Sequence, residues 1–191
     1  MNLFRTLAAA ALLTLGGAGA SSCLKAPDFP LTPAITFRSL TSTYTPRISG
    51  ASAKNLLEFA VDFQDGDGDL GLDAIDVTVP PYNSPTGGHN NLSTGYNYFI
   101  QAFKKDKNGK FMPFITTTGS VGEYDGRYPR LETSTDGKAA PLKGTLRYKL
   151  LLSIDQLSYF PGDVFRFDIS IMDRAFHESN TVTTSEVTLG Q

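Results

Sequence analysis

Several stretches of this chain alternate apolar and polar residues with a period of two, and this pattern constrains the fold more than any other feature. Residues 145–154 read TLRYKLLLSI, and residues 164–173 read VFRFDISIMD. In both, every second residue is aromatic or aliphatic, which is typical of an antiparallel strand that buries one face. The buried faces would be formed by Leu146, Tyr148, Leu150, Leu152 and Ile154, and by Phe165, Phe167, Ile169 and Ile171. After Pro33 no long stretch has the three-to-four apolar spacing of a helix, so the sequence predicts an all-β protein.

Further strands are predicted over residues 34–40, 56–63, 74–79, 96–103, 110–118 and 181–189, with turn-forming residues between them. At Asn108-Gly109 we expect a hairpin turn with positive φ at both central residues. Seven or eight strands in one chain indicate a sandwich or a barrel. Residues 80–95 and 119–141 exceed the usual connection of about 2–6 residues and are predicted as two long loops.

The N-terminal residues, MNLFRTLAAAALLTLGGAGASSC, have the form of an export signal. Arg5 precedes an apolar run shorter than the roughly 20 residues of a membrane-spanning helix, and small residues then lead to Cys23. Cys23 is the only cysteine and resembles the acylated cysteine of bacterial lipoproteins, although Ala20 stands where an aliphatic residue is usual. Cleavage after Ala20 without lipid attachment is the alternative. We expect a lipoprotein signal peptide over residues 1–22, a proline-containing tether over 23–33 and one β-sandwich domain over 34–191.

The charge of the chain bears on its partners and its location. The formal net charge is −2 and no cluster of Lys and Arg occurs, which argues against nucleic acid as a partner. Leu24, and not an acidic residue, follows Cys23, which resembles lipoproteins that are sorted to the outer membrane. We therefore expect a cell-envelope protein that contacts the membrane through its lipid and has an envelope protein or a glycan as partner. The periplasmic and the surface face both remain open.

The segment FQDGDGDLGL, residues 63–72, concentrates charge as no other part of the chain does. Glycines between the aspartates let the chain curl so that alternate carboxylates converge, and Ca²⁺ takes six to eight oxygen ligands. Compared with the helix-loop-helix calcium loop, the candidate ligands are Asp65, Asp67, Asp69, Gly71, Asp73 and Asp76, while Leu70 replaces the usual central glycine. We expect a calcium-binding loop between two strands with a structural role. An acidic turn without metal is the alternative, because Asp-Gly is also a strong turn signal.

Aromatic residues gather in or beside the two long loops. Tyr82, Tyr96, Tyr124, Arg127 and Tyr128 form a candidate ligand-binding set, since exposed aromatic rings can stack on sugars or on a protein partner. The alternative is that these rings cover the open edges of the sandwich.

The sequence contains no established catalytic motif. We find no G-x-S-x-G elbow, no H-E-x-x-H and no phosphate-binding glycine loop. His89 and His177 lie in polar segments far apart in the chain, which gives little support for a transition-metal site. We therefore predict no enzymatic activity, and a hydrolase using loop carboxylates is the remaining enzymatic alternative.

Residues 159–189 resemble the end of a fibronectin type III domain. Pro161-Gly162 stands at the turn before the alternating strand, and Asp173, Ala175 and Ser179 match a hairpin of the form D-x-A-x-x-x-S. Phe165 stands where that family has a residue with a hydrogen-bonding hydroxyl. The resemblance implies an antiparallel β-sandwich of immunoglobulin or fibronectin type.

Most of the chain after the signal also resembles an uncharacterised group of lipoproteins from Bacteroidetes-type bacteria. The matching features are F-x-DGDGDLGL at residues 63–72, GR-x-P at 126–129 and DRA…SNT at 173–181. This resemblance implies a fold and a location but no activity. The predicted function is a non-catalytic envelope lipoprotein, a binding or structural module stabilised by calcium. The alternative is a carbohydrate-binding accessory lipoprotein of a polysaccharide-uptake system.

Overall fold

The computed structural model describes residues 27–84, 95–131 and 139–191, so the predictions for Cys23 and His89 lie outside the described residues. Within these ranges the chain forms eight strands and one short 3₁₀ helix. The elements are β1 (Ala34–Thr45), β2 (Ala53–Asp65), η1 (Asp76–Thr78), β3 (Tyr98–Lys105), β4 (Phe111–Pro113), β5 (Leu142–Ile154), β6 (Val164–Ile171), β7 (Val182–Thr183) and β8 (Val187–Thr188). No helix among the described residues is long and apolar enough to cross a membrane.

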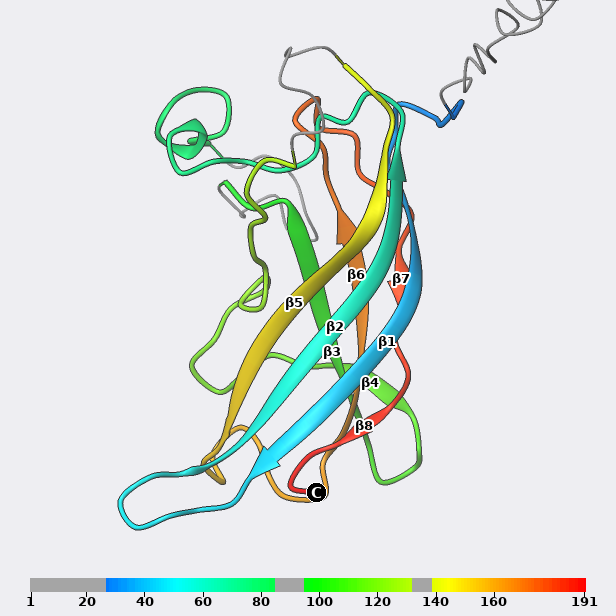
Figure 1. Ribbon diagram of the computed structural model, residues 1–191. Coiled ribbons are helices and arrows are strands. Elements are labelled where there is room, and N and C mark those ends of the chain that lie inside the picture. The colour runs from blue at the N-terminus through cyan, green and yellow to red at the C-terminus, as the bar shows by residue number, and fades with distance from the viewer. Residues whose placement is uncertain (1–26, 85–94, 132–138) are drawn as a thin grey trace, which may run out of the picture.

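The strands form two antiparallel sheets that pack face to face (Figure 1). One sheet has the order β1-β2-β5, and the other has the order β4-β3-β6-β7, with β8 also paired to β6. This is the division of the immunoglobulin fold, in which strands A, B and E share one sheet and strands C, F and G share the other. The predicted antiparallel β-sandwich is therefore confirmed.

The alternating residues form the core between the sheets. Every second residue of β2 from Leu57 to Phe63 is buried, and the same holds for β6 from Phe165 to Ile171. The rings of Phe59 and Phe167 meet edge to face across the two sheets, with 5.0 Å between their centroids. Burying one such side chain stabilises the fold by about 1.5–3 kcal/mol, so the period-two pattern accounts for the pairing of the sheets.

Residues 74–79 do not form the predicted strand. Residues 76–78 form η1 instead, and of the three alternating side chains Val77 is half-buried while Ile75 and Val79 are 70% and 49% exposed. The local cause is Asp76, whose carboxylate accepts a hydrogen bond from the backbone N–H of Asp73 (2.8 Å) and closes the chain into a turn. This hydrogen bond, which the Asp76 carboxylate accepts from a residue three positions earlier, outweighs the weak alternation of this short stretch.

The turn between β3 and β4 is longer than predicted. Only Gly109 has a positive φ (80°), and the backbone N–H of Asp106 donates to the carbonyl of Lys110 across a five-residue turn. The Asp106 carboxylate accepts hydrogen bonds from the backbone N–H groups of Asn108 and Lys110, and this stabilises the longer form.

The last predicted strand, residues 181–189, is divided into β7 and β8. Between them Thr184 donates its backbone N–H to the carbonyl of Phe167 (2.8 Å), and its hydroxyl accepts the N–H of Phe167 (3.0 Å). This side-chain contact takes the place of one regular ladder position and interrupts the strand.

One end of the sandwich gathers the segments that matter for function. Strands β2 and β6 run in the same direction in opposite sheets, and both end there (Figure 1). Residues 27–33, the described part of the predicted tether, lie at this same end (Figure 1). The described parts of the two long loops, residues 80–84 and 119–131, contain no strand of more than one bridged residue, as predicted.

Candidate metal centre

The acidic segment is the continuation of β2, whose last residue is Asp65. The side chain of Asp65 points into the protein and is fully buried. Its Oδ2 accepts a hydrogen bond from the backbone N–H of Asp69 (3.1 Å), which curls the segment back on itself. Gly68 (φ 69°) and Gly71 (φ 94°) lie in the left-handed region, so glycine is required at these two positions for the chain to follow this path.

Three carboxylates converge at this end of the sandwich. One oxygen each from Asp65, Asp69 and Asp173 lies within 4.8 Å of the other two. Asp65 ends β2 and Asp173 follows the end of β6, and the two strands finish side by side in opposite sheets. Asp173 was predicted only as a hairpin residue. The usable signal in the sequence was an aspartate directly after each of two alternating strands that belong to opposite sheets.

The carboxylates of the segment have oxygens without partners. Among the described residues, Oδ1 of Asp65, of Asp67 and of Asp69 is buried and accepts no hydrogen bond. Leaving a buried polar atom unsatisfied costs about 1–3 kcal/mol, and more when it is charged. Three such oxygens in one turn can accept a bond from a further group, such as a cation or a water molecule.

The electrostatics of the site disfavour its charged form. Burial, reinforced by the charges of Asp67, Asp69 and Asp173, raises the pKa of Asp65 to about 7. Burial and the charges of Asp173 and Asp67 also raise the pKa of Asp69. Like charges this close cannot all ionise at low cost unless a cation neutralises them.

Asp173 is held in place by its own hairpin. Its Oδ1 accepts the backbone N–H of His177 (2.7 Å), and its Oδ2 lies 2.9 Å from the Nδ1 of the same histidine. The backbone N–H of Arg174 donates to the carbonyl of Asp69 (3.2 Å), which joins the hairpin to the acidic segment. A carboxylate that is oriented by a second residue is a common arrangement for a metal ligand. His177 was predicted as a solvated loop residue, and the structure gives it this orienting contact.

The donor set consists of oxygen atoms. The convergent groups and the nearby Asp67 are carboxylates, and no cysteine or histidine belongs to the group of three. Hard cations such as Ca²⁺ and Mg²⁺ prefer such oxygens, whereas zinc sites are built from sulfur and nitrogen. The residues present therefore fit a hard divalent cation.

Asp73 and Asp76, two of the predicted ligands, turn to Arg130 instead. Arg130 donates to both oxygens of Asp76, from Nη2 to Oδ1 (2.6 Å) and from Nε to Oδ2 (2.9 Å), and its backbone N–H donates to Asp73. The hydrogen bond from Arg130 lowers the pKa of Asp76. The physical reason for the difference is that the chain turns after Asp73 and enters η1 at Asp76, which carries both carboxylates away from Asp65.

Gly71, the remaining predicted ligand, is placed by its neighbours rather than by a metal. Its carbonyl accepts a hydrogen bond from Nη1 of Arg174 (3.4 Å), and so does the carbonyl of Leu70 (3.2 Å). Of the six predicted positions, the structure thus brings Asp65 and Asp69 together with Asp173, and it places Asp67 beside them.

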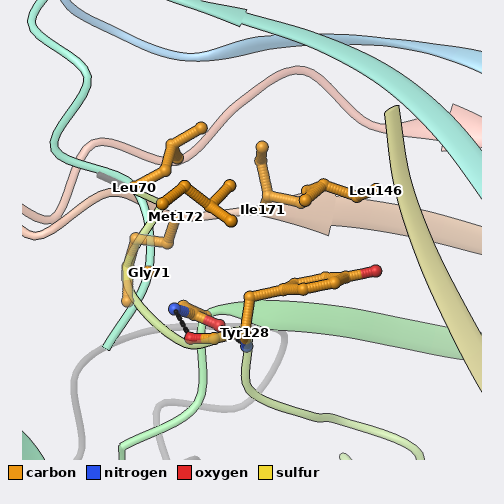
Figure 2. Close-up of a pocket in the computed structure, with 8 residues that line it drawn as sticks. Leu70, Gly71, Tyr128, Leu146, Ile171 and Met172 are labelled. Carbon is orange, nitrogen blue, oxygen red and sulfur yellow. Dashed lines mark hydrogen bonds between the residues drawn. The ribbon is translucent and has the colours of Figure 1, made fainter. Parts of the chain in front are cut away.

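The space beneath the acidic segment is nearly filled by side chains. A cavity of about 10 Å³ lies there, lined by residues of both sheets and of the loops. Figure 2 shows the side chains of Leu70, Ile171 and Leu146 on one side of it and the ring of Tyr128 on the other. A cavity of this size holds at most one water molecule, and none of the convergent carboxylates lines it.

The predicted aromatic ligand set is largely used inside the protein. Tyr124 is buried, and its hydroxyl lies 2.6 Å from that of Tyr159. The half-buried ring of Tyr128 packs edge-on against Tyr98, with 5.2 Å between centroids. These two rings support the alternative that the tyrosines cover an edge of the sandwich.

The other three members of that set differ in exposure. Tyr82 donates its hydroxyl to the carbonyl of Arg174 (2.9 Å) and packs against the ring of Phe176. Tyr96 is 40% exposed, and Arg127 is exposed. Of the predicted set, Tyr96 and Arg127 are thus the two members whose side chains are open to solvent.

Comparisons with known proteins add little to this geometry. No family model matches the chain, and no curated protein matches it. A solved structure, the Northeast Structural Genomics Consortium target SoR45, aligns over 83% of this chain and 87% of that chain, with 9% sequence identity and a TM-score of 0.32. Similarity at this level says nothing about the function of the chain.

Proposed function

We propose that this protein is a non-catalytic β-sandwich module of the cell envelope, held to the outer membrane by a lipid on Cys23 and stabilised by a bound calcium ion. The observation that carries the proposal is the convergence of Asp65, Asp69 and Asp173, with the Asp65 side chain fully buried and one of its oxygens without a partner. A bound cation would supply that partner and neutralise the repulsion.

The position of the site supports a structural role. Asp65 and Asp69 belong to the continuation of β2, whereas Asp173 follows β6 in the other sheet. An ion bound by all three would therefore link the two sheets at one end of the sandwich. Such a link between the sheets favours stabilisation over catalysis.

Calcium is the cation that an envelope compartment and this donor set favour. Ca²⁺ accepts irregular sets of carboxylates and backbone carbonyls, whereas Mg²⁺ demands near-ideal octahedral geometry. Extracellular modules of this kind bind Ca²⁺ with a Kd of roughly 10⁻⁴–10⁻³ M. The placement in the envelope rests on the signal-like start and the single cysteine of the sequence.

The carbohydrate-binding alternative has less support than the structural one. Tyr124 and Tyr128 pack internally, and Tyr82 is fixed by Arg174 and Phe176. A sugar platform needs aromatic rings that are open to solvent.

Calorimetric titration of the full chain with Ca²⁺, after treatment with a chelator, tests the proposal. We expect binding in the range of 10⁻⁴–10⁻³ M and a rise in melting temperature, both abolished by Asp173→Asn. Asp106→Asn removes the same charge at the β3–β4 turn and should leave both unchanged. No heat and no change in melting temperature at millimolar Ca²⁺ would overturn the metal proposal.

Mass spectrometry of the mature N-terminus tests the anchor separately. We expect a diacylated or triacylated cysteine at residue 23 as the first residue. A chain that begins at an unmodified Ser21 would overturn the lipid anchor without affecting the metal site.

A further inference from the structure

Two glycines between the aspartates and a third just after them lie against the backbone of other segments. A Cβ added at Gly66 would overlap the carbonyl of Phe29 and lie 2.7 Å from the carbonyl oxygen of Pro30. At Gly68 it would overlap the carbonyl of Ala140, and at Gly71 it would overlap that of Pro129. The acidic segment is thus a point at which the tether and two later segments of the chain pack.

Hydrogen bonds fix two of these three contacts. Ala140 donates its N–H to the carbonyl of Asp67 (3.1 Å), and Leu131 donates to that of Leu70 (3.0 Å). The contact with the tether is instead a close approach of backbone to backbone, with the side chain of Phe29 half-buried. Because no such hydrogen bond among the described residues fixes the contact with the tether, that contact depends on the exact backbone path of the acidic segment.

Gly66 lies directly between Asp65 and Asp67. Asp65 is one of the three convergent carboxylates, and Oδ1 of each aspartate is buried without a partner. A relaxation of the backbone that moves Asp65 away from the other carboxylates would therefore also move Gly66, and with it the surface on which Phe29 and Pro30 lie.

We propose that cation binding at Asp65, Asp69 and Asp173 docks the tether onto the sandwich. With the ion bound, the acidic segment keeps the path against which Phe29 and Pro30 pack. Without the ion, repulsion between the carboxylates opens the segment and the tether detaches. This inference rests on the proposed function and assigns to the same site control over the attachment of the domain.

The docked and detached states differ in the length of free chain between Cys23 and the sandwich. Phe29 follows Cys23 by six residues, which span at most about 20 Å, whereas the eleven residues from Cys23 to Ala34 span up to about 40 Å. If the lipid is on Cys23, the bound ion would hold the acidic end of the sandwich close to the membrane and fix its orientation. Loss of the ion would roughly double the distance over which the domain can move.

Hydrogen exchange of the full chain in detergent micelles, followed by mass spectrometry with and without Ca²⁺, tests the inference. The amides of Asp28, Phe29, Leu31 and Thr32 report on the tether. We expect Ca²⁺ to slow their exchange measurably, because docking limits solvent access to amides that donate no hydrogen bond among the described contacts. If Ca²⁺ binds by calorimetry but tether exchange does not change, the docking inference is wrong while the metal proposal stands; if Ca²⁺ does not bind, both fail.

A variant separates docking from binding. Gly66→Ala keeps all carboxylates, but its methyl group overlaps the carbonyls of Phe29 and Pro30. We expect this variant to bind Ca²⁺ while its tether exchanges fast with or without the ion. Gly109→Ala, at a turn with open space around the glycine, is the matched control and should keep the Ca²⁺-dependent protection.

If Gly66→Ala does not fold, as judged by circular dichroism, Phe29→Ala weakens the packing of the tether instead. It removes a half-buried ring and leaves the acidic segment intact. A tether that stays protected by Ca²⁺ in whichever of these two variants folds would overturn the inference.

Discussion

Replacing Asp65 with asparagine should stabilise the ion-free protein at pH 8. The pKa of Asp65 is raised from 3.8 to about 7 by burial and by its acidic neighbours. Each pKa unit corresponds to about 1.4 kcal/mol, so ionising Asp65 in the folded state costs up to ~4 kcal/mol. Because the segment can relax and neighbouring carboxylates share the charge, we expect Asp65→Asn to recover about 2 kcal/mol. The asparagine carbonyl can keep the hydrogen bond from Asp69.

The sign of the pH dependence follows from the direction of the shift. The folded state binds the proton of Asp65 more tightly than the unfolded state between about pH 4 and pH 7. The stability of the ion-free protein should therefore be highest below pH 4 for this group and fall as the pH rises through 7. At pH 5 Asp65 is protonated in the folded protein but mostly ionised in the unfolded chain, so the substitution should bring a smaller gain than at pH 8, and the gain should vanish only below about pH 4.

Calcium should reverse the order of stability of Asp65→Asn and the native protein. At a Ca²⁺ concentration one hundred times its Kd, the native protein gains about 2.7 kcal/mol, because the ion binds only the folded state. Asp65→Asn, which loses one carboxylate oxygen and its charge, should gain much less. The variant is thus expected to be more stable than the native protein in chelator and less responsive to Ca²⁺.

Urea denaturation at pH 5 and pH 8, in chelator and in Ca²⁺, measures all four conditions. Asp106→Asn is the matched control, because its Oδ1 accepts hydrogen bonds from Asn108 and Lys110 that asparagine can keep. If Asp65→Asn lowers the stability of the ion-free protein at pH 8, the assignment of Asp65 as a repelled, unsatisfied carboxylate is refuted.

Three further substitutions probe the surroundings of the site and the core, each measured by equilibrium denaturation. Arg130→Met should cost about 1–3 kcal/mol, since it leaves the Asp76 carboxylate, with a side chain only 9% exposed, without its ion pair. Tyr124→Phe should cost about 1–2 kcal/mol, because the hydroxyl of Tyr159 then loses its partner 2.6 Å away. Phe59→Ala should cost about 3–5 kcal/mol, since it opens a cavity at the centre of the sandwich. A cost below 1 kcal/mol for the last change would contradict the placement of that ring in the core.

The strands were predictable where burial repeats with a period of two. In β2 and β6, hydrophobic side chains from Leu57 and from Phe165 onward are buried as the alternation predicts. The same reasoning failed at residues 74–79, because three apolar residues in a short stretch carry little weight against the backbone contact of Asp76. Periodicity reports burial on one face, and it cannot report a local side-chain hydrogen bond.

The candidate site was predictable only in its local part. Asp65, Asp67 and Asp69 stand out because they are close in the sequence. Asp173 lies in the same group only because β2 and β6 end together in opposite sheets, and this depends on the strand order. The partner of Asp76, Arg130, likewise comes from a segment whose path no pattern in the sequence describes. Contacts between distant segments follow from topology, which a single sequence specifies weakly.

The contribution of Asp173 from the second sheet also has a kinetic consequence. Asp65 and Asp69 are near neighbours in the chain, but the third carboxylate reaches them only after β6 and the hairpin that follows it have folded onto the sandwich. A ligand that binds only this late arrangement stabilises the native state more than the folding transition state, so it slows unfolding and leaves the folding rate nearly unchanged. Bound Ca²⁺ would then lengthen the lifetime of the folded domain. Unfolding rates measured by stopped flow should fall with rising Ca²⁺, while refolding rates stay constant.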